Sequence, residues 1–197
     1  MSTRKKPKKQ TIFTIGHSTR SLDELIELLH AHKVRRVIDI RTIPRSRRNP
    51  QYNRETLGPA LRSRKIGYVH LKDLGGLRRT KADSKNIGWH NASFRGYADY
   101  MQTPDFDAAL KRAIRLSAVK PSALMCAEAV PWRCHRSLVA DALTARKFPV
   151  KHIMSVTRAN KHKLTSFARV RGKKVTYPSD KPARRKPPVR KSKQHLK

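Results

Sequence analysis

The chain has 197 residues, which is the length of one domain with extensions. Lysine and arginine total 47 against 13 aspartate and glutamate residues, so the formal net charge is +34. No apolar run approaches the roughly 20 residues that a membrane span needs, and the charged first residues are unlike a secretory signal. We therefore expect neither a membrane protein nor a secreted one. Cys126 and Cys134 are too few for a disulfide scaffold and suit a reducing cytoplasm.

Basic residues are concentrated at the two ends of the chain. Residues 1–10 and 179–197 combine lysine and arginine with proline and lack hydrophobic periodicity, which predicts two disordered cationic arms. Between them, residues 11–178 are expected to form a single domain. Residues 10–179 still contain 34 basic and 12 acidic residues, and repulsion within such a charge opposes folding unless a polyanion is near. We therefore expect nucleic acid as a salt-sensitive partner, bound through its backbone, and a cytoplasmic or nucleoid-associated location.

Strand-like and helix-like segments alternate between residues 11 and 155. Short apolar runs predict five strands, over residues 11–15, 35–40, 67–71, 122–126 and 150–155. Apolar residues at helical spacing predict helices over 21–29, 55–65 and 135–147, and a further helix that begins at Thr103. Such alternation is typical of an α/β fold with a mainly parallel sheet between two layers of helices, a Rossmann-like arrangement. Residues 168–177 are expected to add a β-hairpin.

Ligands of open parallel sheets bind beyond the carboxyl ends of the strands, so the loops there are the first place to seek a site. Gly16, His17 and Ser18 follow the first strand. His17 is a candidate acid or base, and a structural histidine is the alternative. Ser18 is a candidate phosphate ligand, although helix capping is the simpler role for it.

Four arginines lie within residues 41–48, after the second strand. Arg41 and Arg45 are candidate phosphate ligands, because a guanidinium group can donate two parallel hydrogen bonds to a phosphate. Asp39 is either a buried partner that orients Arg41 or a catalytic carboxylate, and we favour the first role.

A loop rich in glycine, asparagine and serine follows the third strand and leads to Trp89, Phe94, Arg95 and Tyr97. These residues predict either a nucleotide pocket, in which Arg95 would bind phosphate, or an aromatic lid that packs on the sheet. We favour the lid.

The most informative segment runs from the end of the fourth strand to the start of the next helix. It places Cys126 at the strand end and Cys134 at the helix start, where the helix dipole favours a thiolate. The remaining candidates in this segment are Glu128 and His135 as catalytic groups and Arg133 and Arg136 as phosphate ligands. No metal or cofactor is expected, since the segment lacks a CxxC motif and the adjacent Cys134 and His135 are an unusual ligand pair; a metal held by Cys126, Cys134 and His135 with His17 is a further alternative. Cys126 as an inert core residue is the alternative.

With these segments identified, the chain resembles the domain of unknown function 488 family from about Thr11 to Pro178. The resemblance is carried by the segments TIGHSTRSLDELIELL (14–29), DIRTIPRSRRNPQYN (39–53), HLKDLGGLRR (70–79), NASFRGYADYM (91–101) and MCAEAVPWRCHRSLVADAL (125–143). It implies a small cytoplasmic α/β protein and does not supply a reaction.

Together the candidate residues predict an enzyme that acts on a phosphate-bearing substrate, a nucleotide or a nucleic acid. Arg41, Arg45 and Arg136 would hold the phosphate, and His17 or His135 would move the proton. Cys126 or Cys134 would be the nucleophile, and Glu128 would orient an imidazole or act as a base. Two alternatives are open: a non-catalytic nucleic-acid-binding protein, and a thiol redox sensor that uses the two cysteines.

Overall fold

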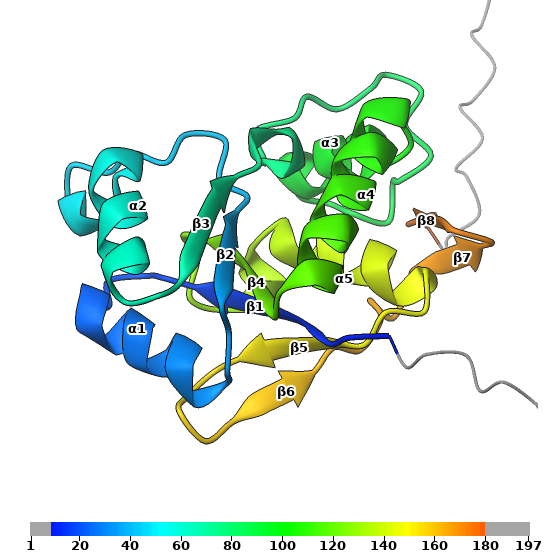
Figure 1. Cartoon of the computed structure of the whole chain (residues 1–197). Coiled ribbons are helices and arrows are strands. Elements are labelled where there is room, and N and C mark those ends of the chain that lie inside the picture. The colour runs from blue at the N-terminus through cyan, green and yellow to red at the C-terminus, as the bar shows by residue number, and fades with distance from the viewer. Residues whose placement is uncertain (1–8, 180–197) are drawn as a thin grey trace, which may run out of the picture.

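Six strands form one sheet at the centre of the computed structural model, which describes residues 9–179 (Figure 1). The strands are β1 (Ile12–Gly16), β2 (Arg36–Asp39), β3 (Gly67–His70), β4 (Ser122–Cys126), β5 (Val150–Ile153) and β6 (Ala159–Lys161). Their order is β3-β2-β4-β1-β5-β6, with β6 antiparallel to β5 and the other neighbours parallel. The predicted α/β fold with a mainly parallel sheet is therefore confirmed. Most of the two predicted arms, residues 1–8 and 180–197, lies outside the described residues.

Helices cover both faces of this sheet. On one face α1 (Leu22–Ala31) and α2 (Arg54–Ser63) pack against strand residues such as Ala123 and Met125. On the other, α3 (Ala92–Tyr100), α4 (Pro104–Val119) and α5 (Arg136–Ala145) pack against Leu124 and Cys126 (Figure 1). Because side chains alternate across a strand, β4 contributes to both cores. Cys126 thus lies on the face that α3, α4 and α5 cover.

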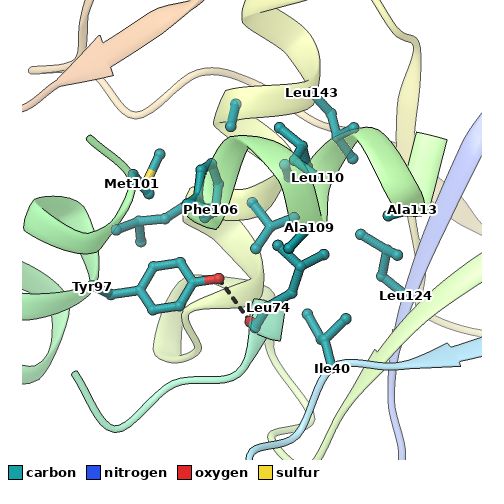
Figure 2. Close-up of a cluster of buried hydrophobic side chains, with 14 of the residues drawn as sticks. Ile40, Leu74, Tyr97, Met101, Phe106, Ala109, Leu110, Ala113, Leu124 and Leu143 are labelled. Atoms are coloured by element: carbon teal, nitrogen blue, oxygen red, sulfur yellow. Dashed lines mark hydrogen bonds between the residues drawn. The ribbon is translucent and has the colours of Figure 1, made fainter. Parts of the chain in front are cut away.

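The larger core is built around α4. Phe106, Leu110 and Ala113 point from this helix toward the sheet and are almost fully buried (Figure 2). Tyr97 of α3 joins the same cluster and donates a hydrogen bond of 2.7 Å to the carbonyl oxygen of Leu74. Each fully buried large apolar side chain contributes about 1.5–3 kcal/mol, so this cluster fixes α3 and α4 over one end of the sheet.

Local sequence signals determine where several helices begin. Ser21 and Glu24 form a complete capping box at the start of α1, and the Thr103 side chain accepts from the backbone N–H of Phe106 at the start of α4. Asn91 caps α3 in the same way. These caps satisfy N–H groups that have no partner within their helix.

The structure has two elements that the sequence pattern did not predict, α3 and β6. Gly96 interrupts the apolar pattern of α3, and the short β6 has no buried residue. The predicted hairpin is present as β7 (Arg169–Arg171) and β8 (Lys174–Thr176), joined through Gly172 at a φ of 59°. Within residues 9–179, no helix combines the length and apolar character that crossing a bilayer requires.

Candidate functional site

The carboxyl ends of β1, β2 and β4 meet at one edge of the sheet. Gly16 lies opposite Cys126, and Asp39 lies opposite Met125 in the strand register. The loops that follow these strands therefore start side by side. Short 3-10 turns shape the surroundings: η1 (Pro50–Tyr52), η2 (Lys72–Leu74) and η3 (Pro131–Arg133).

Cys126 and Cys134 form a hydrogen-bonded pair of thiols. The two Sγ atoms are 2.8 Å apart, and the Cys134 thiol donates to Cys126. This hydrogen bond holds the pKa of Cys126 well below its usual range despite burial, and it raises the pKa of Cys134. The backbone N–H of Arg136, at the start of α5, donates to Cys134 Sγ over 3.4 Å. The pair is thus arranged to carry one negative charge on Cys126 and one proton on Cys134.

His135 faces this thiol pair with a defined ring orientation. Its Nε2 lies 3.2 Å from the carbonyl oxygen of Ile40, and because a carbonyl can only accept, Nε2 carries the hydrogen. Nδ1 is then free to accept, and it lies 3.6 Å from Cys134 Sγ and 3.9 Å from Cys126 Sγ. The absence of a side chain at Gly76 leaves room for the ring, since a Cβ there would meet Nδ1 at 3.2 Å. A neutral His135 therefore turns an unprotonated ring nitrogen toward the two sulfurs.

The same three side chains offer a possible set of metal ligands. Their ligand atoms lie within 4.8 Å of one another. Two thiolates on a tetrahedral Zn²⁺, each at about 2.3 Å, would lie about 3.8 Å apart. The Cys126 and Cys134 sulfurs are 2.8 Å apart, so the pair would have to open by about 1 Å to take that ion. The sulfur separation therefore fits a hydrogen-bonded pair of thiols better than two thiolates bound to one Zn²⁺ ion.

Arg41 is held by a buried carboxylate, which confirms the favoured role of Asp39. Its Nε and Nη2 donate to the two oxygens of Asp39 over 2.9 and 2.6 Å. Nη2 also donates to the carbonyl of Tyr52 over 2.8 Å. Burial acts to lower the pKa of Arg41, but the hydrogen bonds and charge of Asp39 outweigh it and raise that pKa. Most of the guanidinium is occupied by these contacts.

His17 is buried, and its ring contacts Arg41 and Tyr52. Its Nδ1 donates to the carbonyl of Ser18 over 2.8 Å, and its Nε2 accepts from Arg41 Nη1 over 3.2 Å. The ring stacks on Tyr52 with centroids 3.9 Å apart. Burial lowers the pKa of His17, so the neutral imidazole predominates at neutral pH.

Arg136 is buried beside the loop that connects β4 to η3. Its side chain is 1% exposed and donates to the carbonyls of Glu128 and Ala129, each over 3.1 Å. These two hydrogen bonds therefore hold the loop between β4 and η3 in place. This loop also passes so near Gly16 that a Cβ there would collide with the carbonyl oxygen of Glu128.

Two adjoining cavities open at this edge of the sheet. The first has a volume of about 410 Å³ and contains Cys126, Cys134 and His135 together with apolar residues such as Phe94 and Tyr97. The second, of about 470 Å³, is lined mainly by polar and cationic side chains. The residues common to both are Arg41, Ile43, Ala127, Glu128 and Arg133. The two cavities therefore have one wall in common.

The predicted site residues differ in how they face these cavities. His17, Ser18 and Arg45 line the polar cavity, while Glu128 and Arg133 line both. Arg95 lines neither cavity, because its guanidinium donates to the carbonyls of Trp89 and His90.

Sequence reasoning missed two residues that shape the site. Tyr52, which stacks on His17, comes from η1 and carries no local motif. Gly76 belongs to the glycine-rich loop after the third strand, and its proximity to His135 joins segments far apart in the chain. Only the fold reveals these two neighbours.

Comparison with known proteins gives one match. The family model described as "Domain of unknown function DUF488" matches residues 21–143. Searches of curated proteins and of solved structures each found no match. The matched region covers more than half of the chain and includes α1, β2, the dithiol and the start of α5. The chain belongs to the domain of unknown function 488 family.

Proposed function

We propose that the protein is an enzyme that acts on a phosphate-bearing substrate, of which a nucleotide is the simplest, with Cys126 as its nucleophile. The observation that carries the proposal is the opening of the Cys126–Cys134–His135 group into an apolar cavity that shares a wall with a polar, cationic one. A molecule with an apolar reacting part and an anionic end fits such a pair of cavities.

The phosphate end of the substrate is assigned to the polar cavity. Arg133 and Arg45 line this cavity and are exposed, so their guanidinium groups are available to a ligand. Arg41 and Arg136 are engaged by protein groups, and their role is to position His17 and the loop before η3. Arg133 lines both cavities, and it would therefore orient the substrate toward the thiol.

The reacting part of the substrate is assigned to the apolar cavity, in front of Cys126. A thiolate and not a thiol is the attacking form, and the hydrogen bond from Cys134 favours that form by holding the pKa of Cys126 low. The Cys126 sulfur bonds to the electrophilic centre while the bond to the leaving group breaks. The proton on Cys134, no longer held by a thiolate, passes to the leaving group. Water then hydrolyses the adduct: its hydroxyl group goes to the electrophilic centre and its proton goes to Cys134, which restores the Cys126 thiolate and the Cys134 thiol.

Calorimetric titration with a panel of nucleoside monophosphates, followed by mass spectrometry for turnover, tests this proposal. Arg133→Ala and Arg45→Ala should each weaken binding by about 10- to 100-fold, because a charge-assisted hydrogen bond contributes about 1.5–3 kcal/mol. Arg112→Ala, an exposed arginine on α4, is the matched control. Cys126→Ser should bind as the wild type does and lose turnover.

Each half of the proposal can fail separately. Equal turnover by Cys126→Ser and wild type would remove Cys126 as the nucleophile. Binding that is unchanged in both arginine variants would place the phosphate elsewhere.

A further inference from the structure

A third cavity, separate from the dithiol, contains both tryptophans of the chain. Its volume is about 780 Å³, and Trp89, Trp132, Pro131 and Met154 supply its apolar lining. It is bounded by η3, the start of α5, and β5 with β6. Since none of its lining residues is shared with the two cavities at the dithiol, it is not part of the site described above.

The floor of this cavity is a chain of hydrogen bonds through two histidines. His162 Nε2 bonds Asp141 over 2.8 Å, and His152 Nε2 bonds His162 Nδ1 over 2.9 Å. The chain ends at Thr14, whose hydroxyl lies 2.7 Å from His152 Nδ1. Every ring nitrogen is used when Thr14 donates to His152, His152 to His162, and His162 to Asp141. The floor therefore presents fixed ring surfaces to a ligand and no free imidazole nitrogen.

The rim of the cavity is cationic. Lys161 and Lys163 line it and are exposed, and none of the lining residues is acidic. Neither lysine has an ion pair within residues 9–179. The whole chain has a net charge of +34, so the ligand that this rim favours is an anion.

Trp132 adds a flat surface at the same opening. Its side chain is 66% exposed and lines the cavity, so the face of its ring is accessible to a ligand. The next residue, Arg133, faces the dithiol cavities. Aromatic stacking beside lysines is the combination that binds a nucleobase together with its backbone phosphates.

We propose that this cavity binds single-stranded nucleic acid, with a base stacked on Trp132 and the flanking phosphates on Lys161 and Lys163. A single strand is favoured over a duplex because its unpaired bases are free to stack on an aromatic side chain. The proposal does not depend on any reaction at Cys126, so failure of either proposal leaves the other standing.

Fluorescence of the full-length protein, titrated with an oligothymidylate of about 15 nucleotides, tests this proposal. Because both tryptophans line the cavity, bound oligonucleotide should quench the intrinsic emission. Affinities of variants are then measured by anisotropy of a labelled oligonucleotide. Trp132→Ala should weaken binding about tenfold or more, and Trp132→Phe should retain most of the affinity since it keeps an aromatic face.

Salt dependence separates the lysines of the rim from the remaining positive charge. Lys161→Ala/Lys163→Ala should lower the slope of log affinity against log salt by about 1.4, as expected for two lost phosphate contacts on a single strand. Arg112→Ala/Lys120→Ala, two exposed cations of α4 and its C-cap, is the control and should retain tighter binding than the rim double variant.

Two outcomes would overturn the proposal. One is wild-type affinity for oligothymidylate in both Trp132→Ala and the lysine double variant, which would assign binding to cations elsewhere on the chain. The other is that the wild type binds duplex and single strand with equal affinity and that Trp132→Ala does the same. Base stacking on Trp132 would then make no contribution to binding. Cys126→Ser, which impairs the proposed reaction, should bind the oligonucleotide normally.

Discussion

Cys134 donates a thiol hydrogen bond to Cys126 over 2.8 Å; Cys126 is the last residue of β4, and Cys134 lies two residues before the start of α5. The bond joins a strand end to a helix N-terminus, where backbone N–H groups stabilise negative charge. Within the described chain this is the contact that makes one cysteine acidic and keeps the other protonated.

Removal of the donor should make Cys126 an ordinary thiol. Cys134→Ala is expected to raise the pKa of Cys126 toward about 8.5, the value of a free cysteine, because the hydrogen bond from Cys134 is the largest influence on it. Cys134→Ser keeps an O–H donor and should preserve part of the effect. The pH dependence of iodoacetamide alkylation, followed on the Cys126 peptide by mass spectrometry, measures both variants. An unchanged profile in Cys134→Ala would show that another group acidifies Cys126.

Breaking the buried pair of Asp39 and Arg41 should destabilise the fold. Asp39→Asn removes a charge that is fully buried against Arg41, and loss of one partner of a buried pair costs about 3–5 kcal/mol. Asp23→Asn removes the acid of an exposed pair with Arg64 and should cost about 1 kcal/mol or less. Urea unfolding of the two variants gives the comparison, and equal losses would argue against a structural role for Asp39.

A side chain at Gly16 should be poorly tolerated. Gly16→Ala would drive a methyl group into the carbonyl of Glu128, and overpacking of this kind costs about 1–3 kcal/mol. Gly58→Ala, within α2, is the control, because a Cβ there makes only ordinary contacts with Arg62 and Tyr68 and alanine favours a helix by about 1 kcal/mol. Thermal unfolding should therefore move in opposite directions for the two variants, and similar shifts would contradict the close approach at Gly16.

Acid should weaken the fold through His152. Burial, with the nearby charges of His162 and Arg136, lowers the pKa of His152 from 6.5 to about 4, although Asp141 acts in the opposite direction. The unfolded chain therefore binds more protons than the native protein between these values. The stability that neutral His152 contributes is fully present above pH 6.5 and is lost as the pH drops to about 4. The loss amounts to about 3 kcal/mol in total.

The matched experiment for His152 is denaturant unfolding across this range of pH. His152→Gln should lower the slope of unfolding free energy against pH by about 1.4 kcal/mol per unit, which corresponds to one proton. His90→Gln, at an exposed position, serves as the control variant. A slope that His152→Gln leaves unaltered would assign the acid sensitivity to other groups.

Local pattern was sufficient for most of the fold. Helix starts at residue 21 and at Thr103 were both predicted, and each has a signal that lies within four residues: the capping box at Ser21 and the Thr103-Pro104 pair. Lys147 was expected in the last helix, but its φ of 64° shows that the chain has already left the helix there. The short β6 forms because β5 offers it a free edge, which no local periodicity records.

The candidate site was less accessible to sequence reasoning. Cys126 and Cys134 were singled out by their place at a strand end and a helix start, but their contact depends on the path of the intervening loop. The availability of each arginine depends on buried acceptors, which separate Arg41 and Arg136 from Arg133. These acceptors are determined by tertiary packing, and the spacing of residues along the sequence does not reveal them.

Alkylation of Cys126 in the wild-type protein, measured at pH 6.5 with and without the nucleoside monophosphate that binds most tightly, tests the central claim most directly. The account predicts rapid modification of Cys126 at this pH, slow modification of Cys134, and protection of Cys126 as the nucleotide fills the adjoining cavities. Slow modification of Cys126 that rises only near pH 8.5, as for a free thiol, would contradict it.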